Sequence, residues 1–362
     1  MRTKNGLEIF LSSEHKSQPS GPSYVCIWRA LAALLAIVFC LPGAAHSQSP
    51  ELAMREFSSA QIKKGVRTIG MGGDGASQGN YGLVWKDANT AIADYGQTNF
   101  DNGNEFRFEA VGVTSPPLWN DLAIYVIGVT QDTNNVNFRV NSPGLGPGKV
   151  DLVGTGQNQG IFSKIAMPLG RGVSAGILLS HEVSRFDGVS QSGQAVHYET
   201  EWRPSGGGGI AWQVSPQLLV GTRVILNSDL ERRTDPAGVT EGIARSREFR
   251  MGASYSPWAG GLFDYGGTRL HKINAVNGTD VTINAPTYGF EQAFYERRFV
   301  VRLGRDEHAS TFGFSVKSSP FNIDVAYVED MGLDRVGDVF GEKSHSLVMT
   351  LTWDFGQAHS VH

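Results

Sequence analysis

Hydrophobic and polar residues alternate along the segment Ser344–Phe355, close to the end of the chain. Even-numbered positions in it are small or polar except Val348, and odd-numbered positions form a nearly continuous apolar face: His345, Leu347, Met349, Leu351, Trp353 and Phe355. A period of two residues is typical of a β-strand that exposes one face to an apolar medium. In a soluble sandwich that face would pack on a second sheet, whereas in an outer-membrane barrel it would face lipid.

Similar alternation recurs from Phe106 onwards, without a convincing long helix. Thirteen strands are expected: Glu105–Ser115, Asp121–Thr130, Gly160–Met167, Val173–Glu182, His197–Val214, Gln217–Asn227, Arg245–Ser256, Gly261–Ile273, Thr279–Ala285, Gly289–Leu303, Ala309–Lys317, Phe321–Glu329 and Ser344–Phe355. A bacterial barrel with both ends in the periplasm needs an even number of strands. A further strand is therefore expected in Gly82–Gly96, although Asp87–Asp94 is equally consistent with a helix.

The connections between these segments are of two kinds. Short turns rich in Pro or Gly alternate with long polar loops, which are Gln131–Asn158, Val183–Val196, Ser228–Ala244 and Asp330–Lys343. Short turns at one end and long loops at the other are typical of outer-membrane barrels. The predicted fold is therefore an all-β transmembrane antiparallel barrel of about 14 strands, with 12 as the alternative if Thr279–Ala285 is a loop.

Residues 1–47 have the pattern of a secretory signal peptide. Arg29 precedes the apolar run Ala30–Leu41, and a Pro-Gly pair and small residues follow that run. The run is short for a membrane helix, which needs about 20 residues, so an uncleaved anchor is the less favoured alternative. No later stretch approaches 18 consecutive apolar residues, so an exported chain of this kind is either soluble or a β-barrel.

Removal of this segment changes the chemistry that the mature chain can carry out. Cys26 and Cys40 leave with it, which excludes disulfides and thiolate metal sites. Four basic and two acidic residues leave as well, so the net charge moves from −4 to about −6 and disfavours nucleic acid as a partner. The mature histidines are scattered without the spacing of a helical zinc site, and we expect neither a metal nor a cofactor.

Two short motifs resemble enzyme signatures but stand in the wrong context. Gly70, Gly72 and Gly75 satisfy G-x-G-x-x-G without the strand–helix–strand pattern that a dinucleotide site requires. Gly172–Gly176 satisfies G-x-S-x-G but opens an alternating strand, not a strand-to-helix turn. We therefore expect no enzyme, although a site assembled from separate strands would leave no such signal, so a barrel enzyme is kept as the third hypothesis.

The residues expected to face the lumen mix arginines with apolar side chains. Six of them are candidate ligand-binding residues: Arg223, Arg250, Arg298, Arg302, Tyr125 and Ile225. A water-filled porin lumen is mostly polar. This mixture instead suits a ligand with an apolar body and an anionic head. The alternative is that the arginines pair with carboxylates of the wall, such as Asp324, Asp354 and Glu248.

The stretch Gly65–Ser77, which reads Gly-Val-Arg-Thr-Ile-Gly-Met-Gly-Gly-Asp-Gly-Ala-Ser, resembles the N-terminal signature of the FadL/PorV-type outer-membrane proteins. There, an Arg-x-x-Gly-Met-Gly-Gly-Ala-Gly run follows the signal peptide and precedes a fourteen-stranded barrel. The resemblance implies a barrel that is plugged by its own N-terminus. It also implies hydrophobic small molecules as cargo in one branch of the family and protein-secretion partners in another.

These observations define the expected organisation. Residues 1–47 are the signal peptide, 48–81 an N-terminal hatch, 82–355 the barrel and 356–362 a tail. A wide barrel is not filled by its wall side chains alone. The hatch glycines Gly70, Gly72, Gly73 and Gly75 permit positive φ angles and close backbone approach to the wall.

The expected function is the passage or binding of hydrophobic small molecules, with or without a carboxylate, such as long-chain fatty acids or aromatic hydrocarbons. An outer-membrane accessory role in secretion or assembly, without transport, is the alternative. The expected location is the cell outer membrane. The expected partners are the hydrophobic ligand, the outer-membrane lipid and the barrel assembly machinery, but not nucleic acid.

Overall fold

A computed structural model describes residues 67, 69, 71, 80–87, 89–101, 103–116, 118, 121–141, 145, 149–201, 203–274, 279–306, 309–329 and 344–355. The expected signal peptide, the hatch glycines Gly70, Gly72, Gly73 and Gly75, and the tail 356–362 lie outside these residues. Within the described part, no helix is both long and apolar enough to span a membrane.

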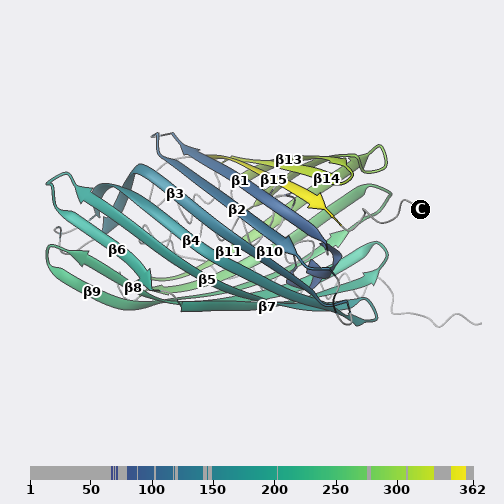
Figure 1. Cartoon of the computed structure of the whole chain (residues 1–362), viewed down its shortest axis with the longest axis horizontal. Coiled ribbons are helices and arrows are strands. Elements are labelled where there is room, and N and C mark those ends of the chain that lie inside the picture. The colour runs from purple at the N-terminus through teal and green to yellow at the C-terminus, as the bar shows by residue number, and fades with distance from the viewer. Residues whose placement is uncertain are drawn as a thin grey trace, which may run out of the picture.

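The described chain is a short 3₁₀-helix followed by fifteen strand segments (Figure 1). The helix is η1 (Tyr81–Asp87), and the segments are β1 (Thr90–Phe100), β2 (Glu105–Thr114), β3 (Ala123–Asn141), β4 (Lys149–Gly170), β5 (Val173–Ser190), β6 (Ala195–Glu201), β7 (Arg203–Ser215), β8 (Leu218–Asp235), β9 (Gly238–Tyr255), β10 (Gly261–Asn274), β11 (Thr279–Phe294), β12 (Phe299–Asp306), β13 (Ala309–Ser318), β14 (Phe321–Glu329) and β15 (Ser344–Asp354).

These segments close into an antiparallel barrel of fourteen strands. β1 pairs with β15 along its whole length, from Thr90 opposite Asp354 to Phe100 opposite Ser344. β6 and β7 both pair with β5 on one side and β8 on the other, so together they fill one position in the barrel. The prediction of fourteen strands is confirmed, and the alternative of twelve is wrong because Thr279–Ala285 is not a loop but pairs residue by residue with β10.

The sequence predicts which side chains of the last strand point outward, and the structure confirms this prediction. Leu347, Met349, Leu351 and Trp353 point outward and are 40–48% exposed. Val348, between them, is buried inside the barrel. A one-residue slip would exchange these two faces, so the burial pattern fixes the register of β15. Large apolar side chains point outward on every long strand in the same way and form the band that faces lipid.

Several predicted boundaries are wrong, and the reasons are physical. Three of the long polar loops are mostly strand: β3, β4, β5, β8 and β9 continue through them, and β8 joins β9 through a two-residue turn at 236–237. Above the membrane the outward face no longer contacts lipid, so the apolar outward face by which strands were recognised ends there. The apolar residues of these extensions, such as Val136 and Phe186, point inward. The fourth, Asp330–Lys343, lies outside the described residues. Between Gly82 and Gly96, η1 precedes a strand that begins only at Thr90.

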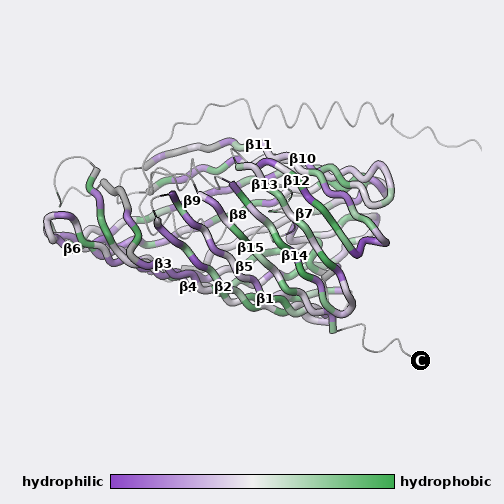
Figure 2. The backbone as a smooth tube through the Cα atoms, turned by 90° about the horizontal axis from the view of Figure 1, so that it is seen from above, coloured by the Kyte–Doolittle hydropathy of each residue, from purple (hydrophilic) through white to green (hydrophobic). Residues whose placement is uncertain are grey.

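Both ends of the barrel chain lie at the end that carries the short turns. β1 begins and β15 finishes there, near the C-terminal label at the right of Figure 1. Short turns are periplasmic in outer-membrane barrels, so the opposite end, where β6, β8 and β9 extend at the left, is extracellular. Figure 2 shows hydrophilic positions more frequent along β3 and β4 toward that extracellular end.

Candidate functional site

The described residues that precede β1, which include Arg67, Ile69, Met71 and residues 80–87, lie against the inner wall of the barrel. We call them the inner segment. Asn80 is buried, and its side-chain oxygen accepts a hydrogen bond from the backbone N–H of Gly82 at 2.9 Å. Its side-chain amide donates to the carbonyls of Ile210 and Thr222, both at 3.0 Å. These carbonyls belong to the neighbouring strands β7 and β8, so Asn80 joins η1 to two strands of the wall.

Glycine pairs in the wall allow this inner segment to approach closely. Gly289 and Gly304 face each other on β11 and β12, and a Cβ on either would clash with the backbone carbonyl of Met71. Gly176 and Gly209 face each other on β5 and β7; a Cβ on Gly176 would meet the carbonyl of Tyr81, and one on Gly209 the side chain of Asn80. A residue without Cβ is needed where another segment lies this near. From the sequence, only the glycines of the N-terminal segment were predicted to allow this close approach, and the glycines of the wall were not.

An ion network ties Arg67 of the inner segment to the wall. Its Nε and Nη2 each donate a hydrogen bond to the carboxylate of Glu291 at 2.8 Å. The same carboxylate accepts from Nε of Arg302 at 2.9 Å, and the Arg302 guanidinium lies 3.0 Å from Asp324. Glu291 and Arg302 are buried. The pairing of Arg302 with Asp324, which the sequence left open, is therefore present.

Tyr81 is fully buried between two cations of the wall. The ammonium of Lys164 lies 5.6 Å from its ring centroid, and the guanidinium carbon of Arg223 lies 5.3 Å away. Both distances allow cation–π attraction. Burial raises the pKa of Tyr81 to about 12, and the nearby Arg223 opposes this rise. The side chain is thus a neutral phenol that holds η1 against β4 and β8.

The structure places most of the predicted ligand-binding residues inside the barrel. Arg223 and Arg250 are buried opposite each other on β8 and β9, and Arg250 forms an ion pair with Glu248. Ile225 is buried in an apolar cluster that also contains Tyr81, and Tyr125 packs at the edge of that cluster. These residues lie on the same inner surface as the inner segment.

Arg298 is the exception, because it is exposed in the turn that joins β11 to β12. The sequence predicted one strand over Gly289–Leu303, separate from Thr279–Ala285. In the structure β11 runs through Pro286, and the turn lies at 295–298. Proline cannot donate to a strand ladder, and Pro286 has a partner on β10, Gly267, but none on β12, whose pairing with β11 begins at Thr287. The same shifted boundary explains why Glu291 was not recognised as a lumen residue.

Two apolar clusters lie on the inner wall, one nearer the periplasmic end and one nearer the extracellular end of β3, β4 and β5. The membrane-level cluster consists of Tyr81, Ala110, Ile127, Val129, Phe162, Leu178 and Ile225. The extracellular cluster consists of Phe100, Phe106, Val136, Leu152, Phe186, Val196 and Tyr198. Between them on β3 and β5 lie the buried side chains of Gln131 and Ser180. Among the described residues, neither the Gln131 amide nor the Ser180 hydroxyl has a hydrogen-bond partner.

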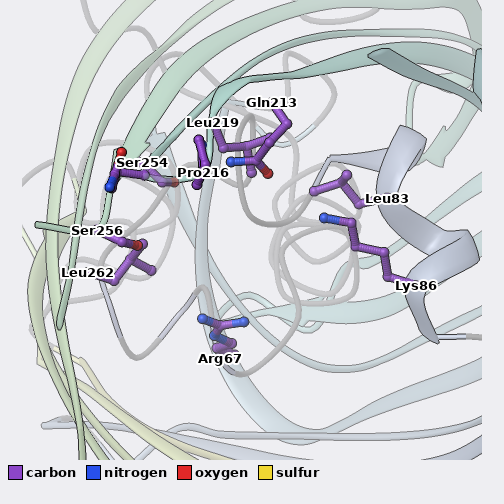
Figure 3. Close-up of a pocket in the computed structure, with 10 residues that line it drawn as sticks. Arg67, Leu83, Lys86, Gln213, Pro216, Leu219, Ser254, Ser256 and Leu262 are labelled. Carbon is purple, nitrogen blue, oxygen red and sulfur yellow. The ribbon is translucent and has the colours of Figure 1, made fainter. Parts of the chain in front are cut away.

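A pocket of about 310 Å³ lies between the inner segment and the wall near the periplasmic end. Figure 3 shows Leu83 and Lys86 of η1 on one side of it and Ser254 and Leu262 of the wall on the other. Arg67 lines it as well. In the described part of the chain, no group of three or more His, Cys, Asp or Glu side chains is arranged to hold a metal ion.

A closed antiparallel barrel with an outward apolar band and periplasmic short turns defines the protein as an outer-membrane β-barrel. Its interior contains apolar clusters and a segment of its own chain, which distinguishes it from a water-filled porin.

Comparison with solved structures shows that this barrel is similar in fold to FadL-type outer-membrane barrels. It is similar to the monoaromatic hydrocarbon channel CymD, with a TM-score of 0.53 and 14% identity over 81% of this chain and 98% of that one. It is also similar to a TodX variant titled a monoaromatic hydrocarbon channel, with a TM-score of 0.52 and 10% identity over 80% and 99% of the two chains. The toluene transporter TodX of Pseudomonas putida gives a TM-score of 0.50 and 9% identity over 80% and 98%. No protein-family model and no curated protein matches the sequence.

Proposed function

We propose that this barrel binds hydrophobic small molecules in its lumen and passes them across the outer membrane. The observation that carries the proposal is the pair of apolar clusters at successive levels of the inner wall. Phe106, Phe162 and Phe186 point inward and pack within these clusters, so the interior of the barrel is more apolar than the polar lumen of a water-filled porin. An apolar interior with few polar groups is typical of a site for a hydrophobic small molecule.

The lumen cations favour an uncharged cargo. Arg250 pairs with Glu248, Arg302 pairs with Glu291 and Asp324, and Arg223 lies over the ring of Tyr81. A carboxylated ligand would have to displace one of these partners and leave a buried charge without compensation. Aromatic hydrocarbons are therefore the first class to test, and long-chain fatty acids the second.

Two positions at the same height of the wall provide a matched test. Ala110 of β2 faces the lumen within the membrane-level cluster. Gly128 of β3 is the partner of the next residue, Val111, and faces outward into open space. Ala110→Trp should obstruct the lumen, whereas Gly128→Trp adds the same ring on the lipid side. Uptake of radiolabelled toluene by cells that depend on this barrel should fall at least tenfold in the first variant and less than twofold in the second.

Both variants are first checked for assembly by heat-modifiable migration in gels. Equal uptake by two assembled variants would contradict passage through the membrane-level cluster. Loss of toluene uptake in Gly128→Trp alone would place the path outside the lumen. If the wild-type barrel takes up fatty acid but not toluene, the proposed path through the lumen stands, and fatty acids replace aromatic hydrocarbons as the cargo class.

A further inference from the structure

Three arginines lie together on the outer surface of the barrel. Arg245 and Arg247 are exposed on β9, and Arg269 is exposed on the neighbouring strand β10. In the register of this pair, Arg269 faces Phe249, and Arg247 faces His271. The three side chains therefore share one face and neighbouring levels of two strands. We call them the β9–β10 arginine patch.

The arginine patch has no acidic counterpart. Within the described residues, none of its three side chains makes a hydrogen bond or an ion pair. Their partners on the other side of β9 are neutral, since Arg245 faces Ser228 and Arg247 faces Leu226. His271 carries no negative charge, and the carboxylate of Asp280 beside it is hydrogen-bonded to the His271 ring at 2.9 Å.

Three other exposed arginines of the extracellular half of the barrel are compensated. Arg107 pairs with Glu105. Arg185 lies 3.1 Å from Glu199, and Arg232 lies 2.7 Å from Glu241, in each case through Nε and a carboxylate oxygen. The extracellular rim thus matches positive with negative side chains at these positions. The patch on β9 and β10 departs from that pattern.

The patch lies at the upper border of the lipid-facing band. A strand rises about 3.4 Å per residue and tilts by about 40° in such barrels, which puts Arg269 roughly 20 Å above the start of β10 at Gly261. The apolar band is about 25 Å tall. On the membrane side of the arginines, the exposed rings of Phe249, Tyr265 and Tyr288 form an aromatic surface, in which the two tyrosines lie 5.4 Å apart between centroids.

An uncompensated cationic patch above an aromatic surface matches the chemistry of a phosphorylated lipid. Arginine binds phosphate through paired, charge-assisted hydrogen bonds. Anionic headgroups attract basic residues close to the membrane surface. We propose that Arg245, Arg247 and Arg269 bind the phosphate groups of a glycolipid of the outer leaflet, whose acyl chains lie along Phe249 and Tyr265. The aromatic surface directly below the arginines favours a lipid over a soluble anion, which would gain nothing from it.

The test uses the full-length barrel in detergent, titrated with bis-phosphorylated lipid A and with the dephosphorylated lipid. Retained lipid is measured by native mass spectrometry. The variant combines Arg245→Gln, Arg247→Gln and Arg269→Gln. Its matched control combines Arg107→Gln, Arg185→Gln and Arg232→Gln, which removes the same charge from compensated positions. Arg247→Gln alone is measured as well, so that the test does not depend on assembly of a triple variant.

The expected result is a loss of affinity for phosphorylated lipid A of about tenfold or more in the patch variant and less than twofold in the control. Arg247→Gln should lose part of that affinity, and the wild type should hold the dephosphorylated lipid much more weakly. Equal losses in the two triple variants would show a general charge effect and overturn the proposal. So would unchanged binding in the patch variant, or complete displacement of the lipid by millimolar inorganic phosphate.

Discussion

Glu291 binds both the inner segment and a neighbouring strand of the barrel wall. Its buried carboxylate accepts hydrogen bonds from Arg67, which precedes the barrel, and from Arg302 on the adjacent strand. Glu291 and Arg302 are buried, so removal of one member of this pair would leave a buried charge without compensation. Loss of the Glu291 charge would also place the guanidinium groups of Arg67 and Arg302 near each other without the carboxylate between them.

We therefore expect Glu291→Gln to lower the free energy of unfolding by about 3–5 kcal/mol, the usual cost of breaking a buried ion pair. The matched control is Glu199→Gln, which removes the partner of Arg185 on the outer rim and should cost about 0–1 kcal/mol. Urea unfolding of both variants in lipid vesicles measures the difference. Losses within 1 kcal/mol of each other would show that Glu291 does not hold the inner segment to the wall.

At the residue scale, the sequence predicts which side chains point into the lumen, but not which side chains pair with each other. Arg223, Arg250 and Arg302 were predicted to face the lumen because they lie on alternating strands, and they do. Arg298 was misplaced because the alternation was extended across a turn. The partners Glu291 and Lys164 stand far from Arg67 and Tyr81 in the chain, so only the closed barrel brings them together.

Single strands are the elements that the sequence predicts best, because lipid imposes one apolar face on each of them. β15 has the expected facing from Leu347 to Trp353. Above the membrane this constraint ends, and β8 and β9 continue with polar residues on both faces, including buried Glu231 and Arg233. These extensions were taken for loops. Their only local signal was the turn sequence around Gly238, which has a φ of 121°.

The strand facing has a direct thermodynamic consequence. Met349 points to lipid five residues above the end of β15, close to the middle of the apolar band. Met349→Arg should therefore cost about 2–4 kcal/mol in the free energy of unfolding. Thr350 faces inward, where its hydroxyl donates to Asp94, and an arginine there would meet that carboxylate. Thr350→Arg should cost much less in the same vesicle assay, and equal costs would contradict the register of β15.

At the scale of the whole molecule, the barrel encloses part of its own N-terminal region. Ile69 is buried against wall residues of β2, β13, β14 and β15, while Met71 lies over β11 and β12 and Tyr81 between β4 and β8. The sequence predicted that this segment occupies the lumen, but not where it contacts the wall. That position depends on glycine pairs that face each other across neighbouring strands of the wall, such as Gly176 on β5 with Gly209 on β7.

Single-channel conductance in a planar bilayer tests most directly whether the chain closes its own barrel. The variant lacks Ser49–Tyr81, and the matched control lacks only the tail 356–362. We expect both variants to assemble, the first to show larger and steadier conductance than the intact protein, and the control to conduct as the intact protein does. If the first variant assembles but conducts no more than the intact protein, the N-terminal segment does not close the lumen.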